Sequence, residues 1–182
     1  MLNRLTRLHI QNFRSLANVS VEVHAINVLF GPNGSGKSTL LDAIWFVRDC
    51  LVRDVAEAAS VRSYGIGALW QGADEGAHIS IKLETDLAEY ELLLGFSSGR
   101  IEPYAGEILA PKDDSKRLIS RDIGSKTAWL YRTVDGLLDR VDLREPEKLA
   151  LAKYPDILRN NPPAVSQMDK LIRFVHFSKS RD

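Results

Sequence analysis

A glycine-rich stretch near the N-terminus limits what this chain can fold into more than any other feature of its sequence. The stretch VLFGPNGSGKSTLLDAI, residues 28–44, places Gly31, four further residues, and then Gly36, Lys37 and Ser38 between an apolar run and a helical pattern. Glycines let the backbone turn tightly, so that successive amide N–H groups converge with no side chain between them. The pattern therefore predicts a strand, an anion-binding loop and a helix, in that order.

The residue types in this loop predict a site for a nucleoside triphosphate and Mg²⁺. The N-terminus of the following helix adds a partial positive charge. Lys37 supplies a full charge to the outer phosphates and is the candidate catalytic cation, and the Ser38 hydroxyl is the candidate metal ligand. The alternative is a turn that only joins a strand to a helix, but a chance match has a probability of about 1% in a chain of this length. The predicted binding residues are Gly34, Ser35, Gly36, Lys37, Ser38 and Thr39.

The residues around the loop predict two further strands and one helix. Residues 5–13 and 18–23 alternate in polarity, as half-buried neighbouring strands do. The run over residues 26–30 is almost continuously apolar, which is typical of a strand buried on both faces. Apolar residues at three- and four-residue spacing predict a helix that begins near Lys37. Its expected buried face is Leu40, Leu41, Ile44, Val47 and Leu51.

The rest of the chain predicts an antiparallel region followed by helices. Residues 78–85, 89–96 and 101–109 read as a β meander, and residues 127–134 and 137–143 as a hairpin around Asp135-Gly136. The polar segments 110–117 and 120–126 are expected to be exposed connections.

Two helices are expected near the end of the sequence. The first covers residues 145–154, with Pro146 in its first turn, and a loop follows over residues 154–164. The second is amphipathic and is marked by Val165, Met168, Leu171, Ile172 and Val175.

Composition narrows the class of protein but does not identify a partner. Lys and Arg total 24, as do Asp and Glu, so the net charge is zero and contact with nucleic acid requires a local patch. A single cysteine, Cys50, excludes an internal disulfide framework and is expected to serve packing. No apolar run approaches the roughly 20 residues that span a bilayer. We therefore expect a soluble, cytoplasmic protein with no membrane partner.

The N-terminal segment resembles a known family. LHIQNFRSL followed by INVLFGPNGSGKSTLLDAI is similar to the start of RecF, SMC and OLD-type ATPases, an AAA-like branch of the ABC-type ATPases. The resemblance implies an α/β P-loop NTPase fold, specifically an ABC-type N-terminal lobe with a mixed sheet and an antiparallel meander. It also implies that the nucleotide is ATP.

The same resemblance adds three residues outside the phosphate-binding pattern. Asn12 and Arg14 are implied to line the nucleotide site, and Asn33 to face the nucleotide of a partner subunit. The alternatives are a solvated surface arginine at Arg14 and a turn-capping residue at Asn33. Gln71 is a weaker candidate, for the glutamine that some ABC-type enzymes use to sense magnesium and water.

Two parts of the family's catalytic site have no convincing match. Asp74-Glu75 does not follow a buried strand, and Asp139 follows only two leucines, so neither reads as the acidic pair that organises magnesium and water. The segment 96–100, FSSGR, is expected to be a hairpin turn and not a signature loop. Arg48, Arg53 and Arg62 read either as contacts to DNA or a partner's phosphates or as a solvated face.

These features predict one N-terminal ATPase lobe over residues 1–182, without the second lobe that carries the acidic strand. We expect a P-loop core over about 1–62, a meander and hairpin over about 77–143, and a helical end over about 145–177. The predicted function is Mg-ATP binding, with hydrolysis once a complementary C-terminal lobe and a dimer partner complete the site. The expected partners are a second copy of the chain or that lobe, with DNA as a further partner of the full-length assembly.

Two other functions stay open at this level. A regulatory nucleotide-binding or interaction module without hydrolysis is favoured by the missing acidic strand. A small-molecule kinase uses the same loop, but the sequence has no obvious arginine-rich lid after it.

Overall fold

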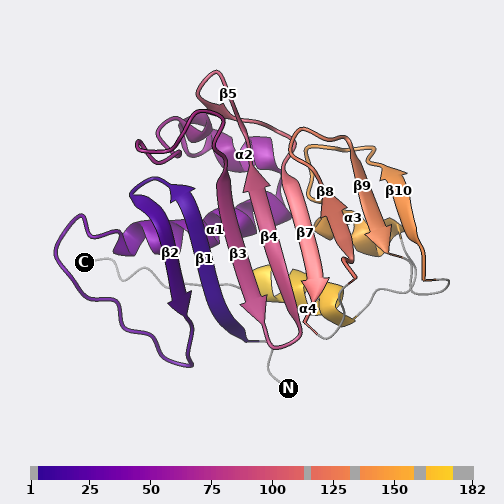
Figure 1. The fold of residues 1–182 in the computed structure, drawn as a ribbon, viewed down its shortest axis with the longest axis horizontal. Helices are drawn as coiled ribbons and strands as arrows, with labels where there is room; N and C mark the ends of the chain where they lie inside the picture. The colour runs from indigo at the N-terminus through magenta and orange to yellow at the C-terminus, as the bar shows by residue number, and fades with distance from the viewer. Residues whose placement is uncertain (1–3, 113–115, 132–135, 158–162, 174–182) are drawn as a thin grey trace.

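One antiparallel sheet with helices on one of its faces makes up the structure. The computed structural model describes residues 4–112, 116–131, 136–157 and 163–173. Eight strands lie in the order β10-β9-β8-β7-β4-β3-β1-β2 (Figure 1). The strands are β1 (Leu5–Phe13), β2 (Leu16–Glu22), β3 (Ile79–Thr85), β4 (Ala88–Leu94), β7 (Gly106–Pro111), β8 (Ile119–Arg121), β9 (Thr127–Tyr131) and β10 (Leu138–Asp142), and a separate small hairpin joins β5 (Phe96–Ser97) to β6 (Arg100–Ile101).

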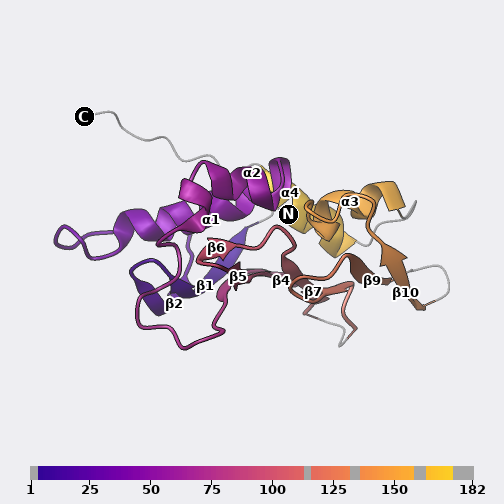
Figure 2. The same ribbon diagram turned by 90° about the horizontal axis from the view of Figure 1, so that it is seen from above.

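The helices pack together against one side of this sheet, which Figure 2 shows edge-on. They are α1 (Lys37–Val52), α2 (Val55–Ser60), the short 3-10 turn η1 (Ser63–Gly65), α3 (Ala150–Ile157) and α4 (Pro163–Arg173). The predicted helix start at Lys37 is confirmed, and so is the last amphipathic helix as far as Arg173. Val175 lies outside the described residues. None of the helices that the structure describes is long and apolar enough to cross a membrane.

Packing of α1 on β1 fixes where the glycine-rich loop stands. Side chains alternate between the two faces along β1, so that Leu8 and Ile10 point toward the helices. Both are buried. The rings of Phe13 and Phe46 stack with their centroids 6.1 Å apart, and both side chains are fully buried. Cys50 is buried on the same helix, and burial raises the pKa of its thiol far above the ordinary range, which agrees with a packing role.

The prediction of a buried strand over residues 26–30 is wrong for this chain. The segment has no strand assignment, and Ile26, Val28 and Phe30 are 84%, 78% and 91% exposed. A strand needs neighbours to pair its N–H and C=O groups. The described strands pair with one another and leave β2 as the edge of the sheet. The apolar run therefore lies in solvent between β2 and α1.

Other details of the predicted fold also need correction. The sheet is not mixed, because each pair of its described strands is antiparallel. The helix expected from residue 145 begins only at Ala150, and Pro146 lies in the turn before it. Residues 120–126 are not simply an exposed connection, since Ser120 and Arg121 belong to β8 and Arg121 is buried. The hairpin of β9 and β10 is confirmed, although most of its turn lies outside the described residues.

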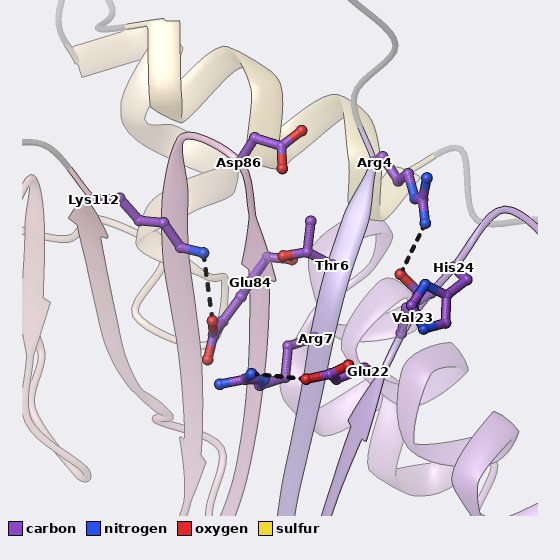
Figure 3. A pocket seen from close by; sticks show the side chains of 9 residues that line it. All are labelled: Arg4, Thr6, Arg7, Glu22, Val23, His24, Glu84, Asp86 and Lys112. Carbon is purple, nitrogen blue, oxygen red and sulfur yellow. Dashed lines mark hydrogen bonds and ion pairs between the residues drawn. The ribbon is translucent and has the colours of Figure 1, made fainter.

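Near the beginning of β1, charged side chains on neighbouring strands of the sheet form ion pairs. They line a pocket of about 530 Å³ at the end of the sheet away from the β1–β2 turn (Figure 3). Arg7 pairs with Glu22 at 3.3 Å, and Lys112 with Glu84 at 3.5 Å, while Arg4 donates to the carbonyl oxygen of Val23. These mutual contacts are mostly exposed and contribute little to stability.

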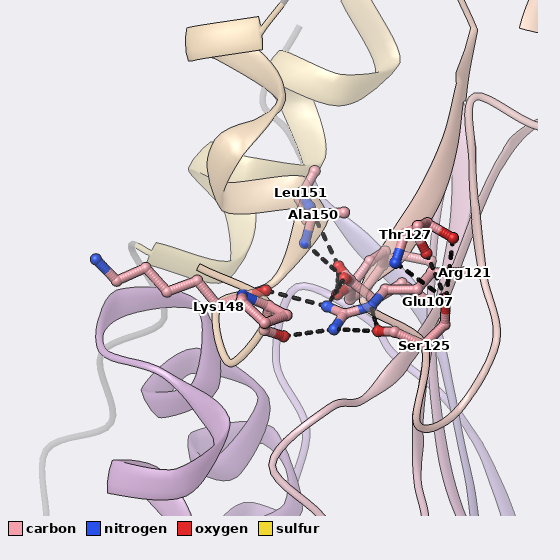
Figure 4. A network of polar contacts seen from close by, with 9 residues as sticks. Glu107, Arg121, Ser125, Thr127, Lys148, Ala150 and Leu151 are labelled. Carbon is pink, nitrogen blue, oxygen red and sulfur yellow. Dashed lines mark hydrogen bonds and ion pairs between the residues drawn. The ribbon is translucent and has the colours of Figure 1, made fainter. Parts of the chain in front are cut away.

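A buried polar network joins the sheet to the start of α3. The carboxylate of Glu107 in β7 accepts hydrogen bonds from the backbone N–H groups of Ala150 and Leu151 (Figure 4). It also accepts one from the Tyr90 hydroxyl. Arg121 lies 3.6 Å from it and donates to carbonyl oxygens that include those of Ser125 and Lys148.

This network sets the residue at which α3 begins, and burial of its charged groups costs free energy. Burial raises the pKa of Glu107, while the Arg121 charge and the two backbone N–H groups of α3 act against that rise. The carboxylate satisfies the otherwise unpaired first N–H groups of α3, which explains why the helix begins at Ala150 and not at residue 145.

Replacing Glu107 with Ala should destabilise the fold by about 3–5 kcal/mol, because it leaves Arg121 buried without a counter-charge. The matched control is Glu22→Ala, which removes the carboxylate of an exposed Glu–Arg pair in the same sheet and should cost about 0–1 kcal/mol. Urea unfolding followed by circular dichroism measures both. Equal losses in the two variants would contradict a special role for Glu107.

Candidate nucleotide site

Three glycines with positive φ shape the loop between the exposed segment 26–30 and α1. Gly31, Gly34 and Gly36 have φ values of 151°, 83° and 91°. Gly36 suits its left-handed backbone, and a Cβ added there would lie 2.9 Å from Leu16 Cδ2, so the Leu16 side chain would have to shift to admit it. The positive φ angles of these three glycines turn the chain tightly between residue 31 and α1.

The first turn of α1 is open toward this loop. Gly36 precedes the helix without any side-chain cap, and its carbonyl oxygen accepts from Leu40 N at 2.9 Å. The first N–H groups of a helix have no partner within the helix, so an uncapped start presents donors and a partial positive charge. Ser38 is exposed at this end, next to the loop. This arrangement suits phosphate oxygens and a magnesium ion bound to them.

The ammonium group of Lys37 lies across the loop. Its Nζ donates to the carbonyl oxygens of Gly31 and Pro32, both at 2.8 Å, and to Ser35 Oγ at 3.1 Å. An ammonium has three N–H donors, and all three acceptors here are uncharged. Phosphate oxygens would replace them with charge-assisted hydrogen bonds, which are about twice as strong.

The turn between β1 and β2 rests on the loop and on the first turn of α1. Ser15 Oγ donates to Thr39 Oγ1 at 3.2 Å, and Leu16 approaches Gly36. Arg14, which precedes Ser15, has a positive φ of 51°, and its backbone N–H donates to the carbonyl oxygen of Ala68 at 2.7 Å. Its guanidinium lies 3.3 Å from the Asp42 carboxylate on α1.

Asn12 and Asn33 have different surroundings from Arg14. The side-chain amide of Asn12 donates to the backbone carbonyl oxygen of His78, so it ties the end of β1 to the chain before β3. This contact does not direct it toward the loop. Asn33 is exposed at the tip of the loop, together with Gly34.

The segment before Gln71 pairs with the last residues of β1. Leu69 forms an antiparallel bridge with Phe13, and Trp70 N donates to the carbonyl oxygen of Asn12. Because the pairing is antiparallel, Ala68 lies beside Arg14 and the chain moves away from Arg14 toward Gln71. Nothing in the local sequence reveals this pairing, because it joins residues more than fifty positions apart.

Arg62 is a functional candidate that the sequence pattern misjudged as part of a solvated face. Its side chain is only 11% exposed and lies 4.9 Å above the ring of Phe46. It pairs with Asp42 at 3.1 Å and with Asp49 at 2.8 Å. Asp42 and Asp49 stand two helical turns apart, a spacing that places both on one face of α1 and is the sequence signal for this cluster.

Comparison with known proteins supports a specific class for the residues that build this site. A family model described as AAA domain matches residues 7–49. The DNA replication and repair protein RecF of Shewanella loihica is 43% identical over 44 residues, which is 24% of this chain and 12% of the relative. RecF of Actinobacillus succinogenes is 50% identical over 44 residues, with the same shares. The matched residues are similar to the N-terminal region of RecF/SMC-like P-loop ATPases.

A weaker similarity extends over nearly the whole chain. The structural maintenance of chromosomes protein 6B of Arabidopsis thaliana is 25% identical over 179 residues, which is 98% of this chain and 15% of that protein. The chain thus spans less than a fifth of the length of these relatives. The matched residues of the RecF/SMC-like region run from β1 through the loop into α1.

Gly36→Ala should destabilise the protein more than Gly34→Ala does. Both positions force a left-handed backbone on alanine, which costs about 1–2 kcal/mol. Only at Gly36 does the new Cβ also meet Leu16, whereas at Gly34 nothing lies within 4 Å. Urea unfolding of the two variants separates backbone strain from the contact. A larger loss at Gly34 would contradict the close approach of the β1–β2 turn to the loop.

Proposed function

We propose that the loop over residues 31–38 binds the triphosphate of Mg-ATP. The observation that carries this proposal is the combination of three positive-φ glycines, an uncapped start of α1 and the Lys37 ammonium held across the loop. Gly34, Ser35, Gly36 and Thr39 supply backbone donors around the phosphates. Lys37 acts as the catalytic cation, and Ser38 binds the magnesium ion.

The metal depends on the nucleotide in this proposal. The part of the chain that the structure describes holds no group of three or more His, Cys, Asp or Glu side chains arranged for a metal ion. Ser38 and the phosphate oxygens are therefore the ligands we propose for Mg²⁺, which neutralises charge on the phosphates when bound. Arg14 contributes a second positive charge from the β1–β2 turn, and Asn33 faces the nucleotide of a second subunit.

Hydrolysis in this proposal needs a complementary C-terminal lobe and a dimer partner. The acidic residues considered from sequence are badly placed for the task. Asp74 and Glu75 are exposed in a turn, and Asp139 lies in β10, at the opposite edge of the sheet from β2. The acidic group that activates water must then come from the second lobe. The RecF and SMC names of the relatives support contact with DNA by the full-length assembly.

The exposed segment 26–30 is the place where that lobe docks. Ile26, Val28 and Phe30 alternate with Leu29, which lines a mainly apolar groove of about 480 Å³ beside α1 and β2. The alternation is that of a strand without a neighbour. A strand from the second lobe would pair with this backbone and cover the groove, next to the phosphate-binding loop. Burial of these side chains would drive the assembly.

A regulatory module without hydrolysis is the second candidate. The observation that favours it is the absence, among the described residues near the loop, of a carboxylate pair at the end of a strand. Its output would be assembly with a partner, controlled by nucleotide. Measuring ATP turnover with and without a complementary C-terminal lobe separates the two. Stimulated turnover supports the ATPase, and a lack of turnover in a demonstrably assembled complex supports the regulatory module.

Lys37→Ala should weaken Mg-ATP binding by about 10- to 100-fold, because it removes charge-assisted hydrogen bonds worth about 1.5–3 kcal/mol. Isothermal titration calorimetry measures the dissociation constants. Lys82→Ala is the matched control, since this lysine pairs with Glu89 at 2.7 Å on the sheet, away from the loop. Unchanged affinity in Lys37→Ala would overturn the proposed site.

Replacing both Val28 and Phe30 with Ser should leave folding within about 0.5 kcal/mol, because both side chains are exposed. The same change should abolish assembly with a complementary lobe supplied as a separate chain, detected by size-exclusion chromatography. Trp129→Ser is the control, since this residue is 47% exposed on β9, far along the sheet from β2. Normal assembly of the double variant would contradict docking at this segment.

A further inference from the structure

Arg14 and Arg62 both contact the carboxylate of Asp42, but the two contacts differ. Asp42 lies on α1 one turn after Thr39, with Oδ1 3.1 Å from Arg62 Nε and Oδ2 3.3 Å from Arg14 Nη1. The contact with Arg62 is a hydrogen bond as well as an ion pair. Asp42 Oδ2 is buried and has no hydrogen bond, so its contact with Arg14 is an ion pair without hydrogen-bond alignment.

Arg62 is fixed by several partners besides Asp42. It pairs with Asp49, donates to the carbonyl oxygen of Ala58 at 3.1 Å and stacks on Phe46. With its side chain only 11% exposed, leaving this position would strand two carboxylates without their main cation. Arg62 therefore stays in place when its surroundings change.

Arg14 is held loosely by comparison, although its backbone is fixed. Its side chain is 41% exposed, and besides Asp42 it has a contact of 5.6 Å with the ring of Phe13. Its left-handed backbone is maintained by the hydrogen bond to Ala68, a form of strain that tends to occur at functional sites. A polar groove of about 470 Å³, lined by Arg14, Asp42 and Arg62 among others, gives the guanidinium room to move.

The same turn touches the proposed phosphate site. Ser15, the next residue after Arg14, contacts Thr39 in the first turn of α1, and Leu16 contacts Gly36. A guanidinium forms stronger, often bidentate contacts with phosphate oxygens than with a misaligned carboxylate. The Arg14 guanidinium thus lies on the Asp42 carboxylate of α1, while the residues that follow Arg14 contact the proposed anion-binding loop.

We propose that Asp42 is a positioning residue that holds Arg14 beside the loop and competes with the bound triphosphate for its guanidinium. Arg62 keeps Asp42 neutralised once Arg14 has turned to the phosphates, so the transfer leaves no buried carboxylate unpaired. This inference rests on the proposed binding of Mg-ATP. It identifies the loss of the Asp42–Arg14 ion pair as a free-energy cost that lowers the affinity for the nucleotide. It predicts that the effect of Asp42 on nucleotide binding depends on the presence of Arg14.

A double-mutant cycle tests this proposal. Dissociation constants for Mg²⁺ with a non-hydrolysable ATP analogue are measured by calorimetry in the unmodified chain, Asp42→Asn, Arg14→Gln and the double variant. Freeing Arg14 from a half-exposed ion pair should tighten binding by about two- to fivefold in Asp42→Asn. The same substitution should have almost no effect in the Arg14→Gln background. Asp42→Glu, which keeps the charge, should retain the affinity of the unmodified chain.

Two results would overturn the proposal. Equal tightening in both backgrounds would mean that Asp42 only repels the triphosphate, and no tightening with Arg14 present would mean that it does not compete. Asp49→Asn is the matched control, because it removes an equal charge from the same helix face without touching Arg14, and it should leave affinity unchanged. Failure of the unmodified chain to bind nucleotide at all would instead refute the proposed function, and this inference with it.

A second readout covers the case in which Asp42→Asn does not fold. In the unmodified chain, the side-chain Nε–H signals of Arg14 and Arg62 are followed by NMR during addition of the Mg²⁺-bound analogue, with Arg14→Gln and Arg62→Gln used for assignment. The Arg14 signal should move strongly and that of Arg62 little. An unmoved Arg14 signal, or equal movement of both, contradicts the exchange.

Discussion

The contact of the β1–β2 turn with the glycine loop is the constraint on which the rest of the site depends. Leu16 Cδ2 lies 2.9 Å from the position that a Cβ at Gly36 would take, and Ser15 contacts Thr39 in the first turn of α1. The stacked rings of Phe13 and Phe46 hold the same strand and helix together a few residues further on. Strand, loop and helix therefore pack as one unit, and the sheet positions the loop. Pre-organisation of this kind removes the entropic cost of shaping the loop when a ligand binds.

An exposed apolar surface, formed by the segment 26–30, lies directly before the glycine loop. Most of the apolar residues of β1 and α1 are buried, whereas the segment 26–30 exposes several large apolar side chains in succession. Monomeric proteins rarely expose such continuous apolar surface without a binding role. Placing this surface directly before the loop would couple assembly to the nucleotide site. The buried Glu107–Arg121 network keeps α3 in register with the far part of the sheet.

Features that depend on neighbouring residues could be predicted from the sequence. Features that depend on a strand or charge from a distant part of the chain could not. The helix start at Lys37 and its buried face at Leu40, Ile44 and Val47 follow from spacing alone. The apolar run before the loop has the residue pattern of a strand. It forms none here because no strand among the described residues pairs with it. The segment with Arg121 was expected to be an exposed connection, and Arg62 was interpreted as a contact to DNA or a partner's phosphates or as part of a solvated face. Arg121 is buried and the Arg62 side chain is only 11% exposed, since carboxylates and carbonyl oxygens from other parts of the chain converge on them.

The sequence by itself determined the glycine loop, the residues that offer charge to a phosphate, and the alternating strands, because each depends on residues close together in the chain. The cluster of Arg14, Asp42 and Arg62, the pairing of residues 68–70 with the end of β1, and the exposure of residues 26–30 became clear only from the folded chain. The physical reason is that ion pairs and strand pairing join groups far apart in sequence, whose meeting depends on how the whole sheet packs against α1.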